Sequence, residues 1–185
     1  MSGKGGLVRP TMWPLAALCE VELADANRCL VAWGHRMGRL HRGCQGARSF
    51  VLFEGSEPVG VACASALIGE IAGGVRWLTR DRCVELSRLC ASRPGLCRVV
   101  LRLWREVCFP LMGREFAVSY QDAVIHSGAT YRFDGWQRVA FSHSGFDRRS
   151  GRLGRDKWVW VWPPGPPAGW VVVDPGPCEA ATGPD

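Results

Sequence analysis

The middle of the chain most constrains the fold, because it has the pattern of a strand, a helix and a second strand in succession. Residues 82–90 and 115–120 are short and apolar, as strands buried in a sheet are. Between them, Pro94 and Gly95 precede apolar residues at helical spacing over residues 96–108. Such a unit joins parallel strands by a right-handed crossover. The helix is expected to bury a face made of Leu96, Val99, Val100, Leu103 and Val107.

Further strands and helices are expected on both sides of this unit. A strand at 20–23 leads into a helix at 24–33, and the sequence Glu-Gly-Ser-Glu-Pro between two later runs is typical of a hairpin. Strands are predicted at 49–53, 59–67, 76–78, 136–142 and 157–162, and a short helix at 126–133. Together these elements predict an α/β fold with a mixed sheet, a central parallel βαβ unit and helices on both faces.

Composition separates three regions along the 185 residues. Residues 1–12 are rich in glycine and polar residues and are expected to be flexible, whereas residues 13–162 have the pattern of a folded domain. Residues 163–185 contain seven prolines, and proline at this density cannot continue a sheet. A chain of this length has room for one sizeable core.

Apolar runs and cysteines indicate a cytoplasmic protein. No apolar run reaches the roughly 18 residues of a membrane span, and Pro14 interrupts the short apolar stretch near the N-terminus, which argues against a secretory signal. The nine cysteines are odd in number and form no Cys-x-x-Cys pair, so neither a disulfide framework nor a metal site is predicted. Cysteine is expected here as a small core residue.

The net charge of +6 favours an acidic partner. It is carried by 21 arginines and only 2 lysines, and the arginine guanidinium binds phosphate with two hydrogen bonds and stacks on bases. Nucleic acid or an acidic cofactor would suit this surface, although an ordinary solvated surface is the alternative. Two loops concentrate the charge and are the predicted contacts to double-stranded DNA: Arg36, Arg39, Arg42, Arg148, Arg149, Arg152, Arg155 and Lys157.

Two polar strand ends form the candidate site. Arg88 lies near the end of the first strand of the parallel unit, and Asp122 follows the second strand. Ligands bind beyond the carboxyl ends of strands in an open parallel sheet, so these two side chains are expected to approach each other if the strands are neighbours. For an arginine at a strand end, a structural salt bridge is the alternative.

The order of elements resembles the GNAT acyltransferase fold, and the motifs within it resemble one family. The run CVELSRLCASR, the helix after it and the run AVSYQDAVIHSGATYRFDGW are similar to the ordered motifs of the Mom family of phage DNA-modification proteins. That family also has a Trp-His pair after its first helix, for which Trp33-Gly34-His35 is the counterpart. The resemblance covers roughly residues 18–162.

The resemblance implies an enzyme that modifies the exocyclic 6-amino group of adenine in DNA. In that family the product is a carbamoylmethyl adduct, which shields phage DNA from restriction. Its functional positions fall on His35, Arg88, Asp122 and Tyr131. In such a reaction Asp122 can accept a proton, Tyr131 can return one to a leaving thiolate, and Arg88 can stabilise negative charge, with His35 as a second base.

The sequence leaves the small-molecule donor open. GNAT enzymes that use acyl-CoA bind its pyrophosphate on backbone amides at a helix start, and the aligned stretch here is 93–98. Its glycine is displaced from the usual pattern and Pro94 lacks an amide hydrogen, which counts against acyl-CoA and leaves another activated donor open. The predicted cofactor-binding residues are Arg88, Arg93, Gly95 and Arg98.

Two other functions remain open on the sequence alone. An ordinary GNAT enzyme would acylate a small amine or a protein, and would bind acetyl-CoA tightly without binding DNA. A non-enzymatic DNA-binding protein would show salt-sensitive DNA binding that survives loss of Arg88, Asp122 and Tyr131, and would leave every base unaltered.

Overall fold

A computed structural model describes residues 16–41, 46–143, 146–147 and 152–166. The predicted flexible residues 1–12 and most of the Pro-rich tail lie outside these residues. None of the described helices is long and apolar enough to cross a bilayer. The elements are β1 (Ala16–Val21), α1 (Leu23–Ala32), β2 (Arg48–Glu54), β3 (Glu57–Ser65), β4 (Cys83–Ala91), α2 (Leu96–Leu103), the π-helical turn η2 (Trp104–Cys108), the 3-10 turn η3 (Phe109–Met112), β5 (Phe116–Asp122), α3 (Ala129–Phe133), β6 (Gln137–Ser142), β7 (Phe146–Asp147), β8 (Arg152–Leu153) and β9 (Lys157–Trp162).

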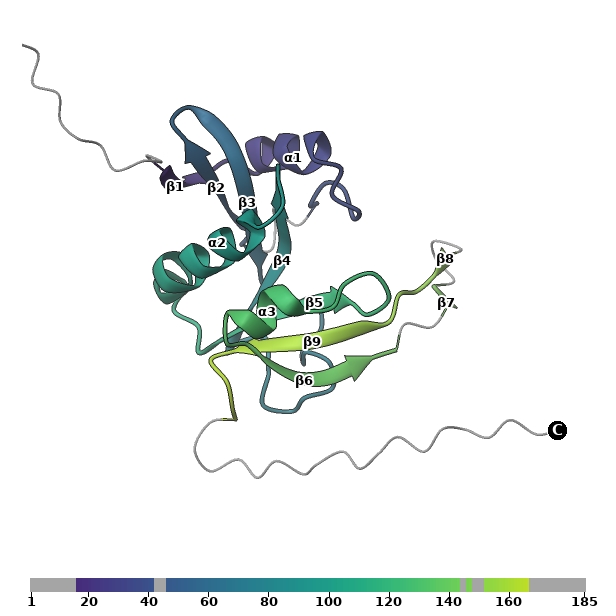
Figure 1. The fold of residues 1–185 in the computed structure, drawn as a ribbon. Coiled ribbons are helices and arrows are strands. Elements are labelled where there is room, and N and C mark those ends of the chain that lie inside the picture. The colour runs from purple at the N-terminus through teal and green to yellow at the C-terminus, as the bar shows by residue number, and fades with distance from the viewer. Residues whose placement is uncertain (1–15, 42–45, 144–145, 148–151, 167–185) are drawn as a thin grey trace, which may run out of the picture.

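Seven strands form one mixed sheet, in the order β1-β2-β3-β4-β5-β9-β6 (Figure 1). Strands β4 and β5 are parallel neighbours, and the other neighbouring pairs in this sheet are antiparallel. The short strands β7 and β8 pair with each other in a separate hairpin. The predicted mixed α/β sheet with its parallel strand–helix–strand unit is therefore confirmed.

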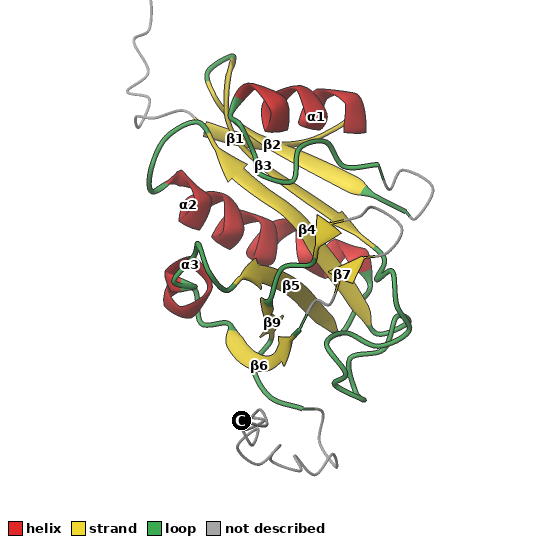
Figure 2. Ribbon diagram, turned by 90° about the vertical axis from the view of Figure 1, so that its right-hand side faces the viewer, coloured by secondary structure: helices red, strands yellow, loops and turns green. Residues whose placement is uncertain are grey.

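Helices α1 and α2 cover opposite faces of the sheet, as Figure 2 shows. Successive residues of β3 point to opposite faces, so that Val61 packs in one buried cluster with Leu30 of α1. The next residue, Ala62, packs in a different cluster with Val100 of α2. The alternation places one helix on each face, as the sequence predicts.

Helix α2 buries the predicted face only in part: three of its five apolar residues pack into the core and two do not. Val100 and Trp104 are fully buried, whereas Val99 and Val107 are exposed. Burying the Trp104 ring removes more apolar area from water than burying either valine, so the helix is rotated to place that ring in the core. Gly60 of β3 permits the close contact, because a Cβ atom there would overlap the Val100 side chain.

Three other predicted elements differ from the structure. Residues 76–78 lie in a turn-rich loop of the described chain rather than in a strand, and Trp77 and Leu78 pack into the core from that loop. Strand β1 begins at Ala16, before its predicted start, because it pairs with β2 along its whole length. Helix α3 begins only at Ala129, since the residues before it form a loop that bonds to the end of β5.

A buried ionic cluster joins the helical layer to the edge of the sheet. Asp134, whose side chain is 3% exposed, accepts hydrogen bonds from Arg105 Nε at 2.7 Å and from Trp136 Nε1 at 3.0 Å. Arg102 Nε donates to the same carboxylate at 3.3 Å. The Arg105 guanidinium also lies 4.2 Å from the ring centre of Trp162 in β9. One carboxylate therefore ties η2 to α3 and the last strands.

Replacing Asp134 is expected to test this cluster. Asp134→Asn should lower the free energy of unfolding by about 3 kcal/mol, because the largely buried Arg105 guanidinium loses its buried carboxylate and keeps only the exposed Glu106 as a counter-charge. Glu106→Gln is the matched control, since Glu106 pairs with the same arginines at the surface and should cost less than about 1 kcal/mol. Urea denaturation followed by tryptophan fluorescence measures both, and equal losses would contradict the role given to the buried carboxylate.

Candidate functional site

A cleft opens where β4 and β5 separate. Their parallel ladder ends at the pair Glu85–Val118, although β4 continues to Ala91 and β5 to Asp122. A bulge at Ser87 shifts the register of β4 against β3 at the same level. Figure 1 shows β5, β9 and β6 running away at an angle from β2, β3 and β4. A cavity of about 230 Å³ lies between the diverging strand ends.

The four predicted catalytic residues all line this cavity. His35 comes from the loop after α1, Arg88 from β4, Asp122 from the end of β5 and Tyr131 from α3. The expected approach of the two strand ends is therefore present in the structure. The catalytic roles given to these side chains stay predictions.

Asp122 has one carboxylate oxygen bound in a turn and the other without a hydrogen bond. Its Oδ1 accepts from the backbone N–H of Val124 at 3.1 Å and of Ile125 at 3.4 Å. Its Oδ2 is buried and has no hydrogen-bond partner among the described residues. The Nη1 atoms of Arg36 and Arg155 lie 3.7 Å and 3.6 Å from Oδ2, which is ion-pair distance but too long for a hydrogen bond. Asp122 therefore retains an unused acceptor in the cavity wall.

The loop after Asp122 is shaped by the buried amide of Gln121. Its Nε2 donates to the carbonyl oxygens of Asp122, at 3.2 Å, and of His126, and its Oε1 accepts from Trp160 Nε1 at 2.8 Å. Gly128 has a φ of +73°, and a Cβ atom there would collide with Gln121 and Trp160. These contacts fix the loop that forms one side of the cavity.

Tyr131 reaches the cavity with its ring held between two tryptophans. The ring stacks on Trp160 and meets Trp136 edge-on, with centroids 5.5 Å apart in both pairs. Its hydroxyl lies 2.8 Å from Ser119 Oγ, which itself donates to the Leu86 carbonyl at 3.1 Å. Because the serine has one hydroxyl hydrogen, Tyr131 is the donor in its pair. Burial raises the pKa of Tyr131 to about 12, so the phenol is protonated at neutral pH.

His35 is a neutral ring in this site. Burial lowers the pKa of His35 to about 4, and the charges of Arg88, His126 and Arg155 act in the same direction. Its Nδ1 accepts from the backbone N–H of Met37 at 3.3 Å, which places the ring hydrogen on Nε2. A ring with this pKa is a hydrogen-bond donor at neutral pH and a weak base.

Arg88 connects β4 to the loop that carries His35. Its side chain is largely buried, at 8% exposure. Its Nη1 donates to the Ser87 carbonyl at 2.7 Å and its Nε to the Gly38 carbonyl at 3.4 Å. The guanidinium thereby ties the loop after α1 to β4.

Three of the predicted cofactor-binding residues are outside the described lining of the cavity, at the start of α2: Arg93, Gly95 and Arg98. Arg93 pairs with Glu54 of β2, and the guanidinium of Arg98 lies over an aromatic ring of α3. Gly95 is the N-cap of α2, with a φ of +85°. From the first turn of α2 it is Cys97 that lines the cavity, and burial raises the pKa of its thiol to about 11.

The predicted DNA-binding residues are found in several places. Arg36 and Arg155 line the cavity, whereas Arg39 borders a separate hollow beside α1. Lys157 lies in β9, with its Nζ 5.8 Å from the ring centre of Tyr120. Arg152 belongs to β8, and Arg42, Arg148 and Arg149 lie outside the described residues.

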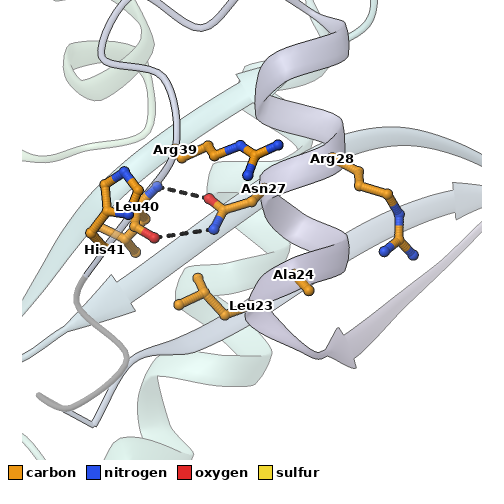
Figure 3. Close-up of a pocket in the computed structure, with 7 residues that line it drawn as sticks. All are labelled: Leu23, Ala24, Asn27, Arg28, Arg39, Leu40 and His41. Carbon is orange, nitrogen blue, oxygen red and sulfur yellow. Dashed lines mark hydrogen bonds between the residues drawn. The ribbon is translucent and has the colours of Figure 1, made fainter.

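Asn27 of α1 fixes the loop that carries His35 and Arg36 (Figure 3). Its Oδ1 accepts from the Leu40 N–H at 2.7 Å, and its Nδ2 donates to the Leu40 carbonyl at 3.1 Å. At the other end of the loop, the His35 N–H donates to the Leu30 carbonyl at 2.9 Å. The Asn27 contacts border an open hollow of about 570 Å³ on the outer side of the loop.

Two residues that shape the site belong to the strand end predicted from the sequence but were given no role there: Ser119 and Gln121. Both are buried polar side chains on β5, next to the predicted Asp122. Buried polar side chains need hydrogen-bond partners. Polar residues that recur inside an otherwise apolar strand can therefore be recognised in the sequence, and they predict a polar wall beside that strand.

Solved structures show which fold this chain shares. No protein-family model matches the sequence, and no curated protein matches it. The ribosomal-protein-S18-alanine N-acetyltransferase of Escherichia coli has a TM-score of 0.56 at 14% identity, over 80% of this chain and 92% of that chain. A spermidine N-acetyltransferase variant of Vibrio cholerae has a TM-score of 0.56 at 13% identity, over 79% and 92%. A Bacillus subtilis acetyltransferase in complex with CoA has a TM-score of 0.53 at 14% identity, over 79% and 95%. The chain therefore has the GNAT fold.

The protonation of His35 is a testable property of the site. Its ring is expected to titrate near pH 4, and Arg88→Gln should raise the pKa of His35 because it removes a nearby positive charge. Because the folded-state pKa is below the unfolded value, the stability contributed by this group is present above about pH 6.5 and is lost as the pH falls toward 4. The Cε1–H shift in NMR titrations, assigned with His35→Gln, measures the pKa. A wild-type titration near pH 6.5 would contradict the burial of this ring.

Proposed function

We propose that this protein is an N-acyltransferase that moves an acyl group from a coenzyme A thioester to an amine. The observation that carries the proposal is the presence in one cavity of the unbonded Asp122 Oδ2 and the protonated Tyr131 hydroxyl. The first is suited to take a proton from an amine, and the second to give a proton to a leaving thiolate. The acetyltransferases that share this fold support the same class of reaction.

The donor is proposed to enter along the open edge of β4. Beyond Glu85 this edge has no ladder to β5, so an extended chain with amide groups, such as the pantetheine arm, can bind there as an added strand does. Leu86, Leu89 and Cys97 supply an apolar wall beside it. The likeness to a structure that contains CoA supports this choice of donor.

The start of α2 fits the pyrophosphate of such a donor in part. The first amides of a helix have no intrahelical acceptor, and those of Leu96 and Cys97 are in this position. Pro94 supplies no amide hydrogen, and the guanidinium of Arg93 is already paired with Glu54. Fewer phosphate contacts are therefore available than in a loop with a full set of amides, and a modest affinity for CoA is expected.

The side chains of the cavity suffice for a balanced transfer. Asp122 Oδ2 takes a proton from the amine as its nitrogen bonds to the thioester carbonyl carbon, and Arg88 stabilises the negative charge on the carbonyl oxygen. Tyr131 then gives its proton to the sulfur as the carbon–sulfur bond breaks. Ser119 reverses its hydroxyl to donate to the phenolate oxygen. The proton held by Asp122 returns to Tyr131 through solvent as the products leave.

Tyr131→Phe is expected to lower kcat for acetyl transfer by about 100-fold, because the departing thiolate loses its proton donor. Release of free thiol and mass spectrometry of the N-acetyl product measure the rate. An acetyl thioester of a more acidic thiol, such as thiophenol, needs less help from an acid, so the loss should shrink with that donor. An equal loss with both donors would contradict the role given to Tyr131.

A second candidate function is transfer of a carbamoylmethyl-type group, which is an alkyl and not an acyl group, from another activated donor to the exocyclic 6-amino group of adenine in DNA, with protection of phage DNA from restriction as its purpose. The observation that favours it is the exposed edge of the cavity, where Arg36 and Arg155 lie together with Met37 and Ile125. Guanidinium groups suit backbone phosphates, and apolar side chains suit a base extruded from the duplex. An aromatic amine is also a poor nucleophile that gains from a proton acceptor such as Asp122.

This second candidate predicts a modified adenosine in DNA from cells that express the protein. Asp122→Asn should abolish the adduct and leave DNA affinity within a few-fold, and nucleoside mass spectrometry measures the adduct. Unmodified nucleosides alongside folded protein would contradict DNA modification. Salt-sensitive DNA binding without any altered base would instead favour the non-enzymatic DNA-binding protein.

A further inference from the structure

The cavity has an excess of positive charge next to the proposed position of the amine. Its described lining includes the guanidinium groups of Arg36, Arg88 and Arg155 and one carboxylate, that of Asp122. The neutral ring of His35 adds no charge at neutral pH. An acceptor that brings only ammonium groups would therefore meet net repulsion at this position.

Asp122 and Arg36 lie close together and still have hydrogen-bonding capacity for a ligand. The Arg36 Nη1 atom is 3.7 Å from Asp122 Oδ2, and the guanidinium is half exposed and makes no hydrogen bond with another described residue. The Arg155 Nη1 atom lies 3.6 Å from the same oxygen, on a side chain that is 33% exposed. A buried acceptor atom is thus flanked by guanidinium donors without being bonded to them.

An amine that carries its own acidic group satisfies both halves of this arrangement. Its N–H donates to Asp122 Oδ2, and its oxyanion accepts hydrogen bonds from Arg36, beside the charge of Arg155. The short separation of these groups requires a short spacer between the nitrogen and the oxyanion. Building on the acyl transfer proposed above, we infer that the acceptor is an amine bearing a carboxylate or phosphate group close to its nitrogen. A polycation such as spermidine is expected to be a poor acceptor.

The test compares four small amines with acetyl-CoA as the donor. β-Alanine carries a carboxylate, phosphoethanolamine a phosphate, ethanolamine a hydroxyl at the same place, and putrescine a second ammonium group. The better of the two acidic amines should exceed ethanolamine in kcat/KM by about tenfold or more, as expected for one charge-assisted contact. Putrescine should fall below ethanolamine. The comparison of carboxylate with phosphate identifies the oxyanion.

Variants connect this preference to the cavity. Arg36→Gln should reduce the preference for the acidic amine over ethanolamine by about tenfold, because the oxyanion loses its charged partner. Arg76→Gln is the matched control: it removes the same charge from an exposed residue in the loop between β3 and β4, outside the described lining of the cavity. That variant should retain the full preference.

Calorimetric titration of the same amines in the absence of acetyl-CoA separates binding from transfer. If an acidic amine binds, and if its binding weakens in Arg36→Gln and not in Arg76→Gln, the inference is supported whether or not the amine is acetylated. If no amine is acetylated, that result counts only against the proposed acyl transfer. Preferential acetylation of ethanolamine or putrescine would overturn the inference and leave acyl transfer standing. An acidic preference that survives Arg36→Gln, or the absence of both binding and acetylation, would also overturn it.

Discussion

Strands β4 and β5 stop pairing before either strand ends, and the candidate site follows from this separation. The parallel ladder stops at Glu85–Val118, while β9 continues to pair with β5 as far as Asp122. Strand β5 therefore leaves β4 together with β9, and the backbone groups exposed at the separation need other partners. The Ser119 hydroxyl supplies one by donating to the Leu86 carbonyl. The separation produces both the space of the cavity and the polar groups that line it.

One buried tryptophan links the two groups that are proposed to move protons. The indole N–H of Trp160 donates to Gln121, which shapes the loop after Asp122, and its ring stacks on Tyr131. Gly128 leaves the space that this ring occupies. The carboxylate and the phenol are thus positioned by a common support in β9, although they belong to a strand and a helix. Their relative position depends on core packing more than on either element alone.

The sequence was sufficient to predict the parallel unit and the meeting of residues from its strand ends, because strand order and direction decide where carboxyl ends lie. It could not predict that Trp104 is buried while Val99 and Val107 are exposed, since that depends on how the helix packs against the sheet, where Gly60 leaves room for Val100. It also misassigned 76–78 as a strand, because Trp77 and Leu78 pack into the core from a loop. The cavity wall was incomplete without Ser119 and Gln121, whose importance comes from hydrogen bonds to Tyr131 and Trp160, residues distant in the sequence.

The attachment of the loop after α1 has an evolutionary consequence. Asn27 and the end of α1 hold this loop in place through hydrogen bonds to its backbone, so the side chains it displays are free to vary. The residues proposed to move protons, in contrast, lie on β5 and α3. Under the proposed function, substrate choice and reactivity therefore depend on different stretches of the polypeptide, and substitutions in one need not disturb the other. This separation offers a physical reason why one fold can be retained while the substrates of its members diverge.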